Sequence, residues 1–243
     1  MTIARFYHSR DLASHQEICL DEMAAYHAAK VLRLKEKDAV VLFDGKGGEY
    51  PARITGLAKN KVMVLTGEWQ DIERESPLQI ILAQAVSSSD KMDFTVQKAV
   101  ELGATGIQPL VCQRGTVRMD AERAKKRVQH WQKVAIAACE QCGRNRIPQV
   151  GEIISLKKFL GQADTGMLRI MLSPKCNLSL KQLEHIGSRI IVLAGAEGGL
   201  TNEEEQAANT AGFTAVKLGR RILRTESAGL TALAALQMLW GDF

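Results

Sequence analysis

The chain has 243 residues, of which 46% are hydrophobic and 24% charged, a composition typical of globular domains with a substantial core. Its formal net charge is +5, which favours a polyanionic partner only if the excess is concentrated. No apolar run is long enough to span a bilayer, and the N-terminus lacks the apolar stretch of a secretory signal. We therefore expect a cytoplasmic protein without membrane contact, and the odd number of cysteines, five, favours reduced thiols.

The first part of the chain has the pattern of a small β-barrel. Short segments with β-branched and alternating residues occupy 39–45, 48–57 and 61–69, separated by turn-forming residues. One short helix is predicted over 21–32. A polar, charged stretch at 71–79 then connects to the rest of the chain. We expect a barrel domain over residues 1–71 and a second domain over 72–243.

In the second domain, predicted strands alternate with predicted helices. The strands cover 78–86, 107–111, 166–174, 189–195 and 213–219, and the helices cover 90–103, 120–142, 201–212 and 226–241. Asp90 is the expected N-cap of the first of these helices, and Gly103 its stop. The alternation predicts the α/β class, with a mainly parallel, doubly wound sheet.

Positive charge is concentrated between Arg114 and Arg146. This segment has nine basic and three acidic residues. Such a stripe suits a polyanion such as RNA. The alternative is an ordinary solvated helix face, and the stripe by itself does not decide between the two.

A glycine-rich turn follows the strand at 189–195. Gly195, Gly198 and Gly199 allow close approach of a ligand to the backbone. Thr201 and Glu204 form a predicted capping box at the start of the next helix. The three acids at 203–205 make this helix start unsuitable for phosphate, so a zwitterionic or cationic ligand fits better. The alternative is a simple strand-to-helix turn.

A second unusual turn precedes the last helix. Arg220, Arg221 and Arg224 stand there with the apolar Ile222 and Leu223 between them. In parallel α/β sheets ligands bind beyond the carboxyl ends of strands, where both turns should lie. An exposed basic loop is the alternative, against which the two apolar residues weigh.

Other motifs point to no cofactor chemistry. Cys139 and Cys142 form a CxxC motif at the end of a predicted helix, where packed cysteines are favoured over zinc or redox use. The sequence has no P-loop, GxGxxG, HExxH or GxSxG motif, and no metal is expected.

At both turns the sequence resembles the RsmE family of 16S rRNA uridine N3-methyltransferases, of the SPOUT superfamily. Gly-Ala-Glu-Gly-Gly-Leu at 195–200 is similar to the family's Gly-Pro-Glu-Gly-Gly-hydrophobic motif. The segment 218–228 is similar to Leu-Gly-x-Arg-Ile-Leu-Arg-x-Glu-Thr-Ala. Further similarity lies at 91–103 and 137–148, and at 4–7, 27–34 and 42–45 in the barrel. Ala196 and Arg220 stand where the family usually has proline, and Ser227 where it has threonine.

The resemblance implies a PUA-like or OB-like barrel followed by a SPOUT domain with a C-terminal trefoil knot. It implies S-adenosyl-L-methionine as cofactor and the uridine U1498 of 16S rRNA, within an assembled small subunit, as target. It also implies a homodimer formed by helix 90–103 and the last helix. The implied cofactor-binding residues are Leu172, Ser173, Leu193, Gly195, Ala196, Glu197, Gly198, Gly199, Leu218, Gly219, Arg221, Ile222, Leu223, Thr225 and Ser227.

For the reaction, Arg224 is expected as a stabilising cation and Glu226 as base or orienting group. Glu226 is equally explained as a carboxylate in a helix first turn. The residues expected to position RNA are Arg5, Tyr7, Arg10, Arg33, Arg114 and Arg144. Tyr7 is suited to stacking on a base, although packing at the barrel edge explains it as well.

Two other functions compete with a methyltransferase. A non-catalytic RNA-binding assembly factor would share the barrel and the basic stripe but would not need the glycine-rich turn. A dinucleotide oxidoreductase is disfavoured by the missing GxGxxG motif and the acidic helix start.

Overall fold

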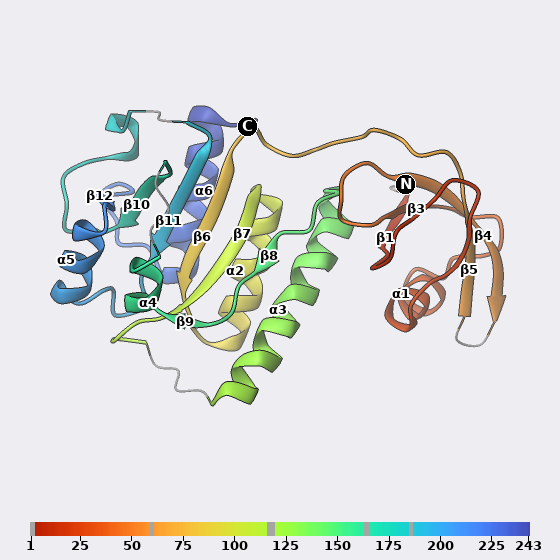
Figure 1. Cartoon of the computed structure of the whole chain (residues 1–243), viewed down its shortest axis with the longest axis horizontal. Helices are drawn as coiled ribbons and strands as arrows, with labels where there is room; N and C mark the ends of the chain where they lie inside the picture. Colours follow the sequence, from red (N-terminus) through yellow and green to blue (C-terminus); the bar gives the residue numbers. More distant parts are fainter. Residues whose placement is uncertain (1–2, 59–60, 116–119, 163–165, 185–186) are drawn as a thin grey trace. The chain divides into compact units, whose positions relative to one another are not determined.

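A computed structural model describes residues 3–58, 61–115, 120–162, 166–184 and 187–243 of the chain. The chain divides into two compact units (Figure 1). One contains Met1–Glu75 and Cys139–Ile147, and the other contains Ser76–Ala138 and Pro148–Phe243. The first unit therefore includes a short segment from far along the chain, at the end of the longest helix.

The first unit is built on one five-stranded sheet. Its order is β1 (Ala4–Tyr7), β3 (Ala39–Phe43), β4 (Tyr50–Ala58), β5 (Lys61–Thr66) and β2 (Glu17–Cys19). β1 and β3 are parallel and the other pairs antiparallel. The apolar sides of the strands and of α1 (Glu22–Tyr26) enclose one core, with Phe6, Leu42 and Val62 fully buried.

The predicted strands and the helix of this unit are confirmed, with the helix continuing as a π-helix, η1 (His27–Val31). The predictions for this unit did not include β1 and β2. Both have four residues or fewer, which is too short for an alternating pattern to be distinctive.

The second unit contains a seven-stranded, wholly parallel sheet, as the alternation predicted. Its order is β12 (Thr214–Val216), β10 (Leu168–Leu172), β11 (Arg189–Ala194), β6 (Gln79–Ala85), β7 (Ala104–Val111) and β8 (Gln149–Val150), with β9 (Ile154–Ser155) also pairing with β7. The short strands β8 and β9 were not predicted.

Helices cover both faces of this sheet (Figure 1). α2 (Ser89–Glu101) and α6 (Thr225–Trp240) pack together on one face, while α4 (Leu156–Leu160) and α5 (Asn202–Thr210) share a core with the other. In β6, Leu82 faces Gly229 of α6, and its neighbour Ala83 faces the opposite core. Burial on both faces explains why residues 78–86 are almost continuously apolar. The remaining helices are α3 (Ala121–Cys142) and η2 (Leu180–Gln182).

The helix ends correct one prediction and confirm two. The N-cap of α2 is Ser88, and Asp90 lies in the first turn, where the helix dipole favours a carboxylate without a capping role. Gly103 follows the end of α2 with φ +80°, a conformation that glycine adopts without strain. Thr201 and Glu204 form the predicted capping box of α5. Within the described ranges we find no helix both long and apolar enough to cross a membrane.

Candidate functional site

A cavity of about 260 Å³ lies at the carboxyl edge of the parallel sheet. Its lining comes mainly from three segments at the ends of neighbouring strands: residues 172–175 at β10, residues 194–200 at β11, and, at β12, residues 216–219 and 221–223 with Thr225. Both unusual turns of the sequence therefore meet at one cavity, in the place where parallel α/β sheets bind ligands.

The glycine-rich turn is tightly folded and leaves room for a ligand. A Cβ atom on Gly195 would lie 3.2 Å from the Leu200 side chain, so glycine is needed for close packing. Gly199 and Gly219 have φ of +70° and +108°, and a Cβ atom on either would meet nothing within 4 Å. Arg114 closes the outer side of the turn by donating hydrogen bonds to the carbonyl oxygens of Gly198 (2.9 Å) and Leu200 (3.4 Å).

The start of α5 beside this turn is already occupied by a carboxylate. Glu204 accepts hydrogen bonds from the backbone N–H groups of Thr201 (2.9 Å) and Gln113 (2.7 Å). Because Glu203 and Glu205 add further negative charge in the same turn, a phosphate would be repelled there. The donor and acceptor set fits a neutral, zwitterionic or cationic ligand, such as a sulfonium.

A chain of buried hydrogen bonds connects the end of β6 with two segments that line the cavity. Gln84, at the end of β6, donates to the Thr225 hydroxyl at 2.9 Å, and this hydroxyl donates to the Gly195 carbonyl at 2.5 Å. Gln84 and Thr225 are 1% and 7% exposed. Gln84 was not among the residues predicted from sequence, although a lone amide near the end of an apolar strand was a usable signal.

Four charged side chains gather beside the cavity. Lys91, in the first turn of α2, forms an ion pair with Glu197 of the glycine-rich turn. Arg224 is the N-cap residue of α6, and Glu226 lies in the first turn of that helix. Both act electrostatically on Lys91. One carboxylate oxygen of Glu226 is buried and has no hydrogen-bond partner among the residues described in the structure. No sequence signal had singled out Lys91.

The structure brings most of the expected cofactor-binding residues to this cavity. Leu193 is an exception, because its side chain is fully buried in the core beneath the edge of the sheet. Ser227 lies in the first turn of α6 and is also outside the lining. Ile222 is 84% exposed although it lines the cavity. The expected residues that line the cavity are Leu172, Ser173, Gly195, Ala196, Glu197, Gly198, Gly199, Leu218, Gly219, Arg221, Ile222, Leu223 and Thr225.

Two of the residues expected to bind RNA have buried side chains that form ion pairs within the first unit. The Arg5 side chain is 8% exposed and donates a hydrogen bond of 2.6 Å to Glu49. The Arg144 side chain is 6% exposed and is paired with Glu75. Sequence alone had no means of detecting these acidic partners, and RNA binding by Arg5 or Arg144 stays a prediction.

The other expected RNA-binding residues differ in their surroundings. Arg10 and Arg33 are exposed, and Arg33 has a φ of +55°. Tyr7 is half-buried with its ring against Phe43, at a centroid distance of 5.8 Å. Arg114 lies over the glycine-rich turn, so its described contacts belong to the cavity.

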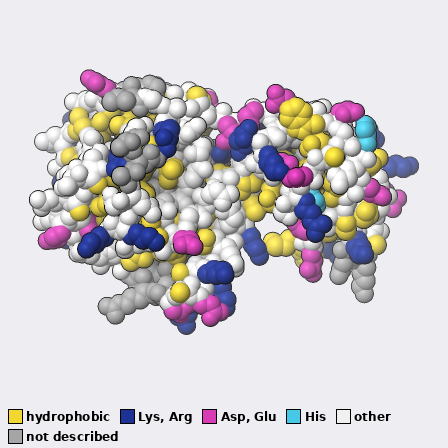
Figure 2. All heavy atoms as spheres, in the orientation of Figure 1, with side chains coloured by type: hydrophobic (Ala, Val, Ile, Leu, Met, Phe, Trp, Pro, Cys, Tyr) yellow, Lys and Arg dark blue, Asp and Glu magenta, His cyan; other side chains and the backbone are white. Residues whose placement is uncertain are grey.

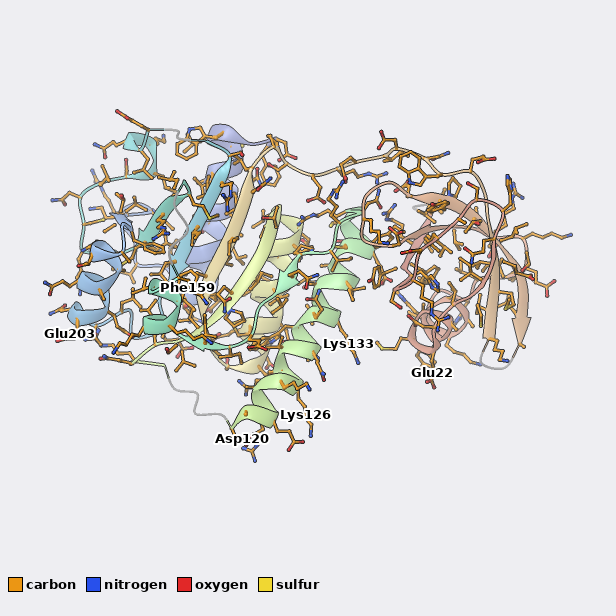
Figure 3. All side chains as sticks on the ribbon, viewed as in Figure 1. Glu22, Asp120, Lys126, Lys133, Phe159 and Glu203 are labelled. Atoms are coloured by element: carbon orange, nitrogen blue, oxygen red, sulfur yellow. The ribbon has the colours of Figure 1, made fainter. Side chains whose placement is uncertain are left out.

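The basic segment separates into different environments. Lys125, Lys126 and Lys133 are exposed on α3, and Figure 3 shows Lys126 and Lys133 projecting from the helix. Arg123 and Lys126 each pair with an acid of the same helix start. On the face drawn in Figure 2, basic side chains are interspersed with acidic ones. Arg118 lies outside the described residues. The stripe is thus a partly neutralised helix face rather than a continuous patch.

The cysteines and a second cavity are the other features of the molecule that could support chemistry. Cys139 is packed in the interior as predicted, and burial raises the pKa of its thiol to about 12. In the described part of the chain, no cluster of His, Cys, Asp or Glu side chains is arranged to hold a metal. A larger cavity of about 700 Å³ lies between β7, α4 and α5, but its lining is mainly apolar and contains neither of the two turns.

The fold and the cavity define a parallel α/β protein built to hold a small ligand without phosphate groups. Comparison with known proteins identifies the family to which this chain belongs. Residues 74–237 match the family model of the RNA methyltransferase domain, and residues 20–65 match that of the RNA methyltransferase PUA domain. The chain belongs to this RNA methyltransferase family.

Individual relatives are similar over the whole chain. "Ribosomal RNA small subunit methyltransferase E" of Buchnera aphidicola is 34% identical, with 99% of this chain and 95% of the relative covered. The crystal structure of the enzyme of that name from Neisseria gonorrhoeae, bound to S-adenosyl methionine, is 42% identical with a TM-score of 0.94 over 100% of both chains. A putative methyltransferase from Legionella pneumophila, in complex with the same cofactor, is 34% identical with a TM-score of 0.96, also over 100% of both chains. The resemblance and the fold class expected from sequence are confirmed.

Proposed function

We propose that this protein transfers a methyl group from S-adenosylmethionine to N3 of a uridine in 16S ribosomal RNA. The observation that carries the proposal is the cavity at which the glycine-rich and arginine-bearing turns meet. Similar proteins carry the name of a small-subunit ribosomal RNA methyltransferase, and two similar structures contain S-adenosylmethionine. A ribosomal RNA substrate supports a cytoplasmic location, which is part of this proposal.

The residues of the cavity fit this cofactor. Gly199 and Gly219 leave open space beside the backbone, and the acidic start of α5 disfavours a phosphate-bearing nucleotide. When bound, the cofactor supplies a methyl group on a sulfonium with a good leaving group. The protein's own part is to hold the uracil N3 in line and to manage its proton. The exposed apolar side chain of Ile222 at the cavity offers a contact for the base.

Mass spectrometry of ribosomal RNA tests this function. We expect 3-methyluridine to disappear from 16S RNA when the gene is deleted and to return when it is restored. Incubation of the purified protein with naked 16S RNA or with assembled subunits identifies the substrate. A 16S RNA whose 3-methyluridine content is independent of the gene would contradict the proposal.

Loss of the Thr225 hydroxyl should weaken cofactor binding. Thr225→Val keeps the shape of the side chain but removes the link between Gln84 and the Gly195 carbonyl. We expect about tenfold weaker affinity for S-adenosylmethionine, corresponding to ~1.4 kcal/mol for a buried hydrogen-bonding hydroxyl. Isothermal titration calorimetry measures this, and Thr225→Ser should recover most of the affinity. Equal affinities for the wild type and the valine variant would exclude the role.

The proposal also assigns a separate role to each domain and includes a homodimer. A barrel domain over residues 1–71 would bind RNA through Arg10 and Arg33, and a domain over 72–243 would hold the cofactor.

α2 and α6 present exposed apolar side chains, Phe94 and Met238, which suits a two-fold interface between copies of this chain. Sedimentation equilibrium should then give twice the 26.7 kDa of one chain.

Reversing exposed charge on α3 should weaken RNA binding and reduce its dependence on salt. Each lysine that neutralises a phosphate releases counterions, so Lys125→Glu with Lys133→Glu should lower the slope of log K against log salt by about 1–2. Fluorescence anisotropy with a 16S RNA fragment measures the slope. Lys181→Glu, on η2 and also exposed, is the control. An unaltered slope would remove α3 from the RNA-binding surface.

A further inference from the structure

Lys91 stands where α2, the glycine-rich turn and the start of α6 approach one another. Its ammonium group pairs with the Glu197 carboxylate, which lines the cavity. The two side chains are 34% and 50% exposed, so the pair is accessible and either partner is free to exchange for a substrate group. A cation that is paired yet accessible at the edge of a reaction site can receive developing negative charge.

One further cation and two carboxylates surround Lys91. Glu197 comes from the turn after β11, and Arg224 and Glu226 come from the start of α6, and all three act on the charge of Lys91. The hydrogen bond to Glu197 is the largest influence and raises the pKa of Lys91. Lys91 therefore carries its positive charge throughout the neutral and mildly alkaline range.

Two cations would stabilise a uracil that has lost its N3 proton. N3 lies between two carbonyl groups, and loss of its proton spreads negative charge onto both carbonyl oxygens. Arg224 is already a candidate for one of them. We infer that Lys91 is a catalytic residue that leaves Glu197 and donates a hydrogen bond to the second carbonyl oxygen of the target uracil. This inference rests on the proposed function.

In the inferred reaction, N3 loses its proton before it takes up the methyl group. The N3–H bond breaks, the proton passes to the Glu226 carboxylate, and the electron pair stays on N3 and its carbonyl oxygens, facing Lys91 and Arg224. N3 then bonds the methyl carbon with this pair, while the electron pair of the broken carbon–sulfur bond stays on sulfur. Glu226 finally releases the proton to solvent. No oxidant, reductant or metal takes part.

Lys91→Met tests the inference against a role as a simple clamp on the glycine-rich turn. At saturating cofactor we expect single-turnover methylation at neutral pH to fall about 100-fold, and to recover partly at alkaline pH, where N3 ionises without help. Affinity for S-adenosylmethionine should stay within twofold of wild type. Lys91→Arg should retain most of the rate. Lys98→Met removes one charge and one ion pair from the same helix and should leave the rate unchanged.

A second measurement does not depend on turnover. RNA labelled with nitrogen-15 at the target uridine, bound with S-adenosylhomocysteine, reports the pKa of N3 by NMR. We expect this pKa to be lower on the wild-type protein than in free RNA, and higher on Lys91→Met than on wild type. Weak cofactor binding with a normal rate at saturation, or an unchanged N3 pKa, would overturn the inference. A wild-type protein that methylates no RNA would instead overturn the proposed function.

Discussion

Glu226→Gln should slow single-turnover methylation of 16S RNA by about 100-fold or more, the usual effect of removing a general base. Glutamine keeps the size of the side chain and its position in the first turn of α6 but cannot take up the N3 proton. Arg224→Ala should slow the same step by about 100-fold, because a cation that stabilises the developing negative charge is lost. Rapid-quench measurements at saturating cofactor and RNA separate these effects from binding.

Matched controls distinguish chemistry from local stability. Glu203→Gln alters a carboxylate in the first turn of α5, a position equivalent to that of Glu226 in α6. Arg220→Ala removes an exposed arginine from the same connection as Arg224, outside the cavity lining. Both controls should keep the parent rate. If Glu226→Gln and Arg224→Ala fold normally and also keep it, then Glu226 is a helix-end carboxylate only and neither residue takes part in the reaction.

Glu49→Gln should destabilise the first unit by about 3 kcal/mol, as expected when one partner of a buried ion cluster is removed. Glu49 is 5% exposed and accepts hydrogen bonds from Arg5 (2.6 Å), Arg74 (2.9 Å) and Asn145 (3.1 Å). The substitution leaves the buried guanidinium of Arg5 without its counter-charge. Hydrogen exchange of β1, β3 and β4 amides across a urea series measures the loss within this unit. Glu68→Gln, which breaks an exposed pair with His15, should have little effect.

The contribution of Glu49 should depend on pH in a defined direction. Burial by itself would raise the pKa of this carboxyl, but hydrogen bonds from Arg74, Arg5 and Asn145 outweigh burial and lower the pKa to about 2. A carboxyl with a lowered folded-state pKa stabilises the fold above its unfolded pKa, near 4.5, and loses that contribution as the pH falls towards 2. The stability difference between wild type and Glu49→Gln should therefore be constant above about pH 5 and shrink below it. A difference that is independent of pH between 5 and 2 would contradict the ion cluster.

The sequence by itself determined most of the longer strands and helices and the two turns that meet at the cavity. Alternating apolar residues marked β3, β4 and β5, and the near-continuous apolar run at 78–86 marked a strand buried on both faces. The glycines, capping residues and arginines marked these turns in the sequence, because the residues that define each turn lie within a few positions of each other. For the same reason the capping box of Thr201 and Glu204 was predictable. Asp90 was the wrong N-cap because α2 begins one residue earlier than Asp90, at Ser89, with Ser88 as its cap.

Only the tertiary structure decided which side chains meet. From sequence, Arg5 and Arg144 were predicted to bind RNA. In the structure Arg5 pairs with Glu49 and Arg144 with Glu75, which lie 44 and 69 residues away in the sequence. Gln84 of β6 and Lys91 of α2 likewise find their partners, Thr225 and Glu197, far along the chain, and no local pattern predicts either contact. Which distant residues become partners depends on how the whole core packs. A pattern over a few neighbouring residues therefore cannot predict these contacts.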